Sequence, residues 1–157
     1  MDQLTLPAPD AAARTLAVPS VLLGTIDVPA DAVYTFPLGL YAYESARHFA
    51  LVPTGREGVW WLQSLEDAAL VFLLADPFLQ RPEYEADLPD GDLASLSASG
   101  APGELAILAI VTLPPDRGGT PTANFRAPVV LNLLRRLGRQ LVLQGERWGL
   151  TEEVGLA

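Results

Sequence analysis

The side chains of this sequence that are suited to chemistry are few and widely spaced. The single histidine, His48, begins an apolar stretch, and the chain has no Gly-x-Ser-x-Gly motif that would supply a nucleophile for it to activate. Gly118-Gly119-Thr120 lacks the following lysine of a phosphate-binding loop. The densest acidic group lacks the spacing and the terminal glutamate of a calcium loop; it consists of Glu83, Glu85, Asp87, Asp90 and Asp92. The sequence therefore predicts no enzyme, no metal site and no cofactor.

The charge of the chain limits the class of partner. Its net charge is −9, it has no lysine, and its lack of cysteine excludes disulfides and thiolate metal sites. A protein that binds nucleic acid generally needs clustered cations, so the balance argues against direct nucleic-acid contact. A small basic group, Arg135, Arg136 and Arg139, is expected to aid solubility or to form an ion pair with the acidic residues. The acidic surface favours a basic protein partner or simply keeps the protein in solution.

The ends of the chain predict its organisation. Residues 1–19 lack the basic and apolar regions of a secretory signal, and no apolar run approaches the ~20 residues of a membrane span. We therefore expect a cytoplasmic protein without a membrane contact. Residues 1–19 are predicted to be a flexible tail, residues 20–150 a single β domain, and residues 151–157 a C-terminal tail with solvated carboxylates.

Short apolar or β-branched stretches, separated by proline and glycine, predict the elements that position these side chains. Strands are expected at 21–28, 33–36, 48–53, 59–64, 70–75, 83–87, 105–112, 129–133 and 140–143, and short helices near 65–69 and 89–96. Strands that recur about every ten residues are typical of a sandwich or a small barrel. The fold class is thus mainly β: a small single-domain, β-barrel-like fold with one or two short helices.

Aromatic residues are the candidates for an exposed binding anchor, because aromatic side chains dominate interaction hot spots. Trp60 and Trp61 are adjacent in a predicted strand and must point to opposite faces, so we expect one of them in the core. Phe78, Tyr84, Phe125 and Trp148 are the other candidates. From the residues alone, the chain is an acidic, non-enzymatic β domain that binds an unspecified partner.

An ordered series of motifs resembles the flagellar assembly factor FliW family over roughly residues 20–150. The motifs are Phe36-Pro-Leu-Gly-Leu40 with Glu44, Phe49-Ala-Leu51, Trp61-Leu-Gln-Ser-Leu-Glu-Asp67, Asp76-Pro-Phe78, Leu105 to Pro114, Thr122-Ala-Asn-Phe-Arg-Ala-Pro-Val-Val-Leu-Asn132 and Gly138-Arg-Gln-Leu-Val-Leu143. One departure is plain. The family often continues Gly-Leu with Pro-Gly-Phe-Glu, whereas this chain has Tyr41-Ala42-Tyr43-Glu44, so its turn must be built differently.

The resemblance implies a barrel-like fold without catalytic activity and two protein partners. Members of the family bind CsrA, a small dimeric RNA-binding repressor, and relieve its block on flagellin translation. They also bind flagellin itself, which couples synthesis to filament assembly. The alternative is a diverged β domain that captures a different protein through an exposed edge or an acidic surface. The residues expected to contact a partner are Asp76, Pro77, Phe78, Glu83, Glu85, Asn124 and Phe125.

Overall fold

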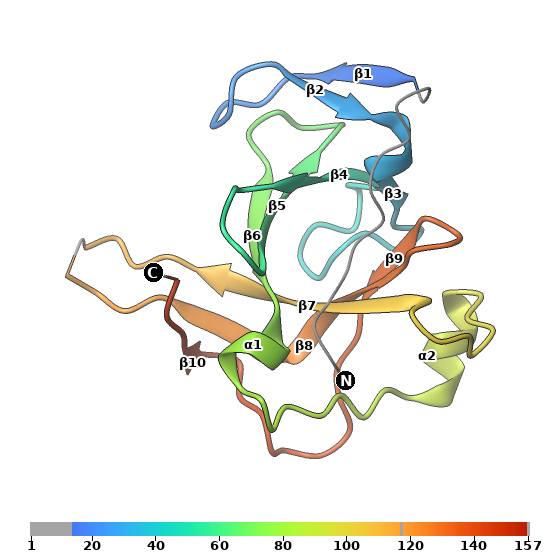
Figure 1. The fold of residues 1–157 in the computed structure, drawn as a ribbon, viewed down its shortest axis with the longest axis vertical. Coiled ribbons are helices and arrows are strands. Elements are labelled where there is room, and N and C mark those ends of the chain that lie inside the picture. Colours follow the sequence, from blue (N-terminus) through green and yellow to red (C-terminus); the bar gives the residue numbers. More distant parts are fainter. Residues whose placement is uncertain (1–13, 117, 157) are drawn as a thin grey trace.

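The computed structural model describes residues 14–116 and 118–156, and its centre is a closed barrel of strands (Figure 1). The strands are β1 (Thr15–Val18), β2 (Ile26–Pro29), β3 (Val33–Thr35), β4 (His48–Pro53), β5 (Val59–Ser64), β6 (Val71–Ala75), β7 (Leu105–Thr112), β8 (Thr122–Asn132), β9 (Leu137–Gln140) and β10 (Glu152–Glu153). The helices are a 3-10 turn η1 (Ala30–Ala32), α1 (Pro77–Gln80) and α2 (Asp90–Ser95). The predicted mainly β, barrel-like class with two short helices is confirmed.

Seven strands close the barrel in the order β8-β7-β6-β5-β4-β3-β9, because β9 also pairs with β8. All of these pairings are antiparallel except β3 with β9, which meet in parallel at Thr35 and Leu137. The β1–β2 hairpin forms a separate sheet at the top of Figure 1. Closure pairs residues 129–132 of β8 with both β7 and β9, whereas the first residues of β8 extend past β9 and pair with β10 on that edge.

Alternation along the strands divides the apolar residues between two faces. Leu108 of β7 lies in a cluster with buried residues of β3 to β6 and β8, which is the barrel interior. Its neighbour Ala109 lies in a second cluster on the outer face of β5 to β8, which residues from 84–96 and 141–154 cover. Trp61 packs against this outer cluster and Trp60 against the interior one, and both are half-buried. The two side chains therefore lie on opposite faces of β5, as expected, and each is partly buried against a different core cluster.

Strand β8 is longer than predicted, because it begins at Thr122 rather than at Val129. A register shift accommodates Pro128: Leu108 pairs with Val129, but Ile110 pairs with Asn124. Four residues of β8 therefore lie opposite the one intervening residue of β7, so the bulge is larger than the usual two-against-one type. Proline can enter this strand because the bulge does not require an N–H group from it.

The polar groups of the bulge are satisfied outside the β7–β8 ladder. The N–H groups of Phe125 and Arg126 both donate to the carbonyl of Gly149, at 3.1 and 3.3 Å. The N–H of Ala127 donates to Oδ1 of Asn124 at 2.9 Å. The segment thus fixes the chain near residue 149 against the barrel, so its role in the fold is that of a clamp.

Four local predictions differ from the structure. Residues 65–69 form a turn rather than a helix, because Oγ of Ser64 accepts from the N–H groups of Glu66 and Asp67 and no further turn follows. Residues 83–87 form no strand, because Tyr84 between them turns inward to the outer cluster. The strand expected at 21–28 is shorter and forms only β2 (Ile26–Pro29). The strand expected at 140–143 lies earlier in the chain, as β9 (Leu137–Gln140).

The two predicted tails are also partly ordered. Residues 1–13 lie outside the described residues, but Thr15–Val18 form β1 and pair with β2. At the other end, Glu152 and Glu153 form β10, which pairs with Ala123 and Thr122 of β8. The carboxylate of Glu152 accepts from the N–H of Gly149 at 2.8 Å, so it is not simply solvated.

Candidate functional site

Three of the expected contact residues lie at the end of β6, where α1 begins. Asp76 is buried and caps α1, because its Oδ1 accepts from the N–H of Phe78 at 2.9 Å. Pro77 is buried at the first helical position, which favours proline because its missing N–H costs nothing there. Phe78 is half-buried. Of the three, only Phe78 presents side-chain surface to a partner.

Phe78 belongs to an aromatic group that sequence reasoning named one residue at a time. Its ring lies 5.3 Å from that of Tyr84, which lies 5.4 Å from Phe125 and 5.0 Å from Trp148. The hydroxyl of Tyr84 donates to the carbonyl of Phe125 at 2.7 Å, and burial raises the pKa of that hydroxyl. Phe125 has no exposed surface. The structure brings these rings together as packing, and Phe125 lies in the core. Asn124 lies next to the bulge, where it pairs with Ile110.

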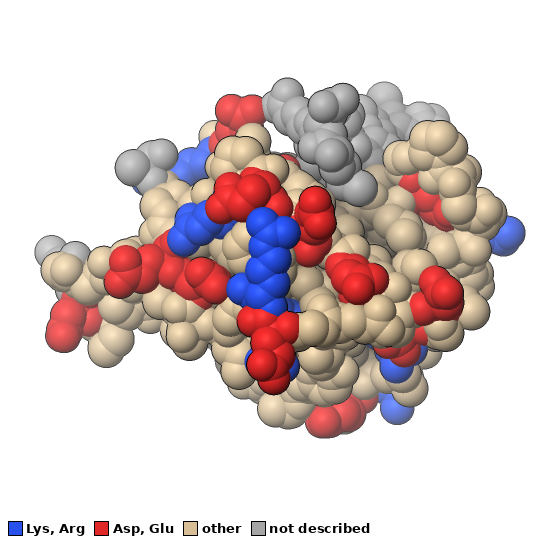
Figure 2. All heavy atoms as spheres, turned by 90° about the horizontal axis from the view of Figure 1, so that it is seen from below, with Lys and Arg blue, Asp and Glu red and all other residues tan. Residues whose placement is uncertain are grey.

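The acidic pair Glu83 and Glu85 flanks the buried Tyr84 and is exposed. On the side that carries α1 and α2, carboxylates spread over the surface and enclose a few arginines (Figure 2). Arg147 approaches Glu85 at 3.8 Å, and Arg139 pairs with Asp92 at 3.1 Å. These two arginines neutralise part of the negative charge of this face, and its other carboxylates keep it acidic. The ion pair of Arg139 with an acidic residue is one that the sequence led us to expect.

A second surface lies on residues 37–47 between β3 and β4, which we call the tyrosine loop. Leu38, Tyr41 and Tyr43 are 59%, 54% and 44% exposed. Two positive-φ residues shape the loop: Gly39 at 65° and Ala42 at 71°. The N–H of Tyr43 donates to the carbonyl of Leu40 at 2.8 Å, which closes a turn around Tyr41 and Ala42. The turn leaves the side chain of Tyr41 exposed, whereas the ring of Tyr43 is partly exposed and packs edge-on against Phe72, with ring centroids 5.3 Å apart.

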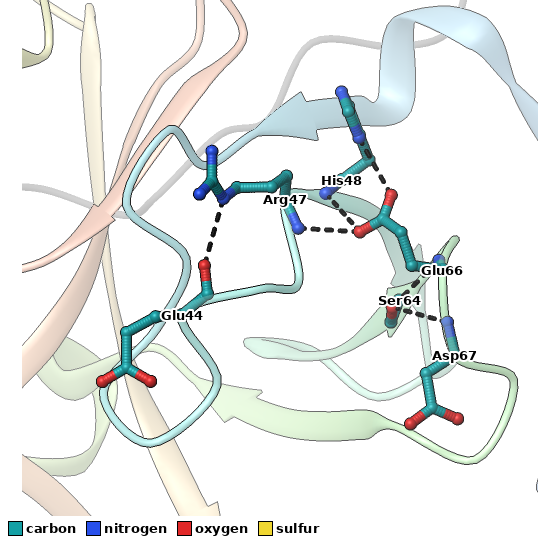
Figure 3. Close-up of polar contacts among 6 residues, drawn as sticks. All are labelled: Glu44, Arg47, His48, Ser64, Glu66 and Asp67. Carbon is teal, nitrogen blue, oxygen red and sulfur yellow. Dashed lines mark hydrogen bonds and ion pairs between the residues drawn. The ribbon is translucent and has the colours of Figure 1, made fainter.

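Glu66 ties the end of the tyrosine loop to the turn after β5 (Figure 3). Its Oε1 accepts from the N–H groups of Arg47 and His48 at 2.7 and 2.9 Å, and its Oε2 lies 2.9 Å from Nδ1 of His48. Burial acts to raise the pKa of Glu66, but these donors outweigh it and hold the pKa below its ordinary value. Glu66 is therefore ionised at neutral pH and fixes the loop.

A hollow of about 480 Å³ opens between the tyrosine loop and the turn after β5. Tyr43 lines it together with the carboxylate residues Glu44, Glu66 and Asp67, and neither arginine nor lysine is among its lining residues. In Figure 3 the carboxylates of Glu44 and Asp67 extend away from β4. A partly exposed aromatic ring beside the exposed carboxylates of Glu44 and Asp67 is suited to a cationic side chain of a protein partner.

The chemistry of both surfaces is that of recognition. Among residues 14–116 and 118–156, no group of three histidine or acidic side chains is arranged to hold a metal ion. In the same residues, none of the helices is long and apolar enough to cross a membrane. Sequence reasoning missed the tyrosine loop, although the pair Tyr41 and Tyr43 in a stretch with turn residues was a readable signal for exposed aromatics.

Comparison with known proteins places the chain in a family. Residues 17–154 match the family model described as FliW protein. A flagellar assembly factor FliW of Treponema pallidum is 39% identical over 132 residues, which cover 84% of this chain and 87% of the relative. One from Thermotoga maritima is 34% identical and covers 82% and 86%. A crystal structure of the flagellar assembly factor FliW superposes with a TM-score of 0.77 at 28% identity, covering 89% of this chain and 96% of the other. Fold, motif order and sequence identity agree, and the chain belongs to the FliW family of flagellar assembly factors.

Proposed function

We propose that this protein is a non-enzymatic regulator that binds CsrA in the cytoplasm and so relieves the block of flagellin translation. It also binds flagellin, and flagellin that accumulates displaces CsrA. When filament assembly consumes flagellin, the protein is free to bind CsrA again. Membership of the FliW family over residues 17–154 is the observation that carries the proposal.

The charge and shape of the tyrosine loop support a basic partner. An RNA-binding protein needs a cationic surface, and the hollow beside Tyr43 offers the exposed carboxylates of Glu44 and Asp67 with no arginine or lysine in its lining. The third carboxylate, Glu66, is already paired with His48. Complementary charge raises the association rate of such a pair and selects against acidic partners. We therefore propose the tyrosine loop as the CsrA contact.

The face around α1 is proposed as the second contact surface. Its accessible members are Phe78, Glu83 and Glu85, together with the half-buried Asn124. Phe78 supplies an apolar anchor and the two glutamates supply a polar rim, which is the usual composition of a protein interface. The buried Asp76, Pro77 and Phe125 support this surface from beneath.

Calorimetry and surface binding with purified CsrA and purified flagellin test the proposal. The wild-type protein is expected to bind each partner, and flagellin is expected to displace CsrA from a preformed complex. Rising salt should weaken the CsrA complex mainly by slowing association. Absence of binding to both partners at tens of micromolar would show that the proposed function is wrong.

A matched pair of double variants locates the CsrA contact. Glu44→Lys with Asp67→Lys changes the net charge by +4 beside Tyr43, and Asp27→Lys with Glu146→Lys makes the same change at exposed positions on other elements. The first variant is expected to weaken CsrA binding roughly tenfold, mostly through the association rate, and the second by clearly less. Equal losses would show that net charge alone matters and that the tyrosine loop is not the contact.

A further inference from the structure

Residues 152–156 lie against the edge of β8 and helix α1, at the lower left of Figure 1, and we call the place that they occupy the groove. Glu152 and Glu153 pair with Ala123 and Thr122 of β8 as an antiparallel strand. The N–H of Val154 continues this pairing by donating to the carbonyl of Pro121 at 3.0 Å. The closed barrel leaves this outer edge of β8 available, and the chain's own end covers it.

Side chains on the other wall of the groove hold the segment by its backbone. The amide of Gln80 makes a two-point contact with Gly155: its Nε2 donates to the carbonyl at 2.8 Å and its Oε1 accepts from the N–H at 3.1 Å. Arg81 donates to the carbonyl of Glu153 at 2.6 Å, and Arg56 donates to the carbonyl of Leu156. Contacts of this kind are made with the main chain and do not depend on the sequence of the segment.

Only one side chain of the segment is deeply buried. Val154 is 5% exposed and enters the outer cluster that contains Phe125, while Glu153 and Gly155 are exposed and Leu156 is half-buried. The groove therefore recognises an extended backbone with one aliphatic side chain in a fixed place. A two-residue strand with a single deeply buried neighbour is also the kind of element that opens locally before the rest of the fold.

We infer that this groove is a binding site for an extended segment of another polypeptide, and that residues 152–156 occupy it as a displaceable internal ligand. The occupant adds a strand to the edge of β8 and places a valine-like side chain where Val154 lies, which is recognition by β-augmentation. Arg56 and Arg81 line the groove, so the segment it takes is neutral or acidic. This separates the groove from the tyrosine loop, whose carboxylates select a cationic partner.

The internal ligand sets how strongly the site is masked. A segment tethered by a short connection competes at an effective concentration of about a millimolar. A free peptide at tens of micromolar is thus largely excluded from the wild-type protein. A change that weakens the tethered segment, without altering the groove, unmasks the site.

Peptide binding to the full-length protein tests the inference. The probe is a fluorescent peptide with the chain's own sequence Thr-Glu-Glu-Val-Gly-Leu-Ala, and the control peptide carries aspartate in place of valine. Fluorescence anisotropy measures peptide binding, and circular dichroism verifies that each variant is folded. The variant Val154→Asp is expected to bind the probe at least tenfold more tightly than wild type and not to bind the control peptide. A folded variant that does not bind the probe, or that forms a dimer without binding it, overturns the inference.

Hydrogen exchange on the wild-type protein keeps the test decisive if the variant does not fold. The amides of Val154 and Gly155 are expected to exchange together, at least tenfold faster than those of Val129 and Val130 in the barrel, and to slow when excess probe peptide fills the groove. Exchange of Val154 and Gly155 only at the rate of the barrel amides would show that the segment does not leave, and would overturn the inference.

Discussion

Replacing Ala42 with glycine is expected to stabilise the protein. Ala42 is exposed and has a φ of 71°, which is the left-handed region that L side chains with a Cβ avoid. The FliW-family pattern that this chain resembles has glycine at this place, where the chain has alanine between two tyrosines. No buried contact is lost when the methyl group is removed, because the residue is exposed.

The magnitude follows from two opposing contributions. Left-handed backbone at a non-glycine residue costs roughly 1–2 kcal/mol, which glycine removes. Glycine also gives the unfolded chain more freedom, which costs about 0.4–1 kcal/mol. The net gain for Ala42→Gly is therefore about 0–1.6 kcal/mol, with a central value of ~0.8 kcal/mol, which corresponds to a rise in Tm of roughly 2–3 °C for a chain of this size.

Urea unfolding followed by tryptophan fluorescence measures the change, and two other substitutions serve as controls. Ala94→Gly, at an exposed position in α2, is expected to lose about 1 kcal/mol of stability, because helix interiors disfavour glycine. Ala42→Val is expected to destabilise, since a β-branched side chain tolerates the left-handed region less than alanine does. An Ala42→Gly protein that is less stable than wild type would refute the strain argument for this turn.

Two further predictions concern packing and pH. Gly138→Ala places a Cβ within 2.3–2.6 Å of the Phe36 ring and is expected to cost about 1–3 kcal/mol in urea unfolding, whereas Gly91→Ala, in open space within α2, should be neutral or stabilising. The pKa of Glu104 is lowered, chiefly because the N–H of Ser99 donates to its carboxylate. The ionised carboxylate therefore stabilises the fold above the pKa that Glu104 has in the unfolded chain. This stabilisation is lost as the pH falls through the pKa that Glu104 has in the folded protein. Glu104→Gln should therefore flatten the decline in the urea midpoint as pH falls below about 4.5, and an unchanged pH profile would contradict this role.

Strands bounded by proline or glycine could be read from the sequence. The predicted spans 48–53, 59–64 and 105–112 coincide with β4, β5 and β7. Each is an apolar stretch with a proline or glycine at or just beyond one of its ends, so local signals and tertiary pairing agree. Where they disagree, the prediction failed: β8 runs through Pro128 because a bulge and the carbonyl of Gly149, which is distant in sequence, satisfy its backbone.

The exposure of the candidate contact residues could not be read in the same way. Phe78 and Phe125 are both aromatic and both follow or lie within strands, yet the first is half-buried and the second has no exposed surface. The difference arises because residues 84 and 148 fold back over the outer face of the barrel, which is a tertiary event without a local signature. The family motifs identified both segments as characteristic of the family. They did not show which of the two aromatic side chains is buried and which is accessible to a partner.

A strained turn shapes the tyrosine loop, which we propose as the CsrA contact. Gly39 allows no side chain, because a Cβ there would lie 2.5 Å from the carbonyl oxygen of Tyr43, and Glu66 anchors the far end of the loop. The backbone of the loop holds Tyr41 exposed, and packing on Phe72 holds the partly exposed ring of Tyr43. Both effects reduce the entropy that a partner must remove on binding. Glycine at position 42 relieves strain but also loosens the turn, so Ala42→Gly should raise stability while lowering affinity for CsrA. Parallel unfolding and calorimetric measurements on this variant would test that opposition: a gain in both quantities would show that the strain at Ala42 does not serve binding.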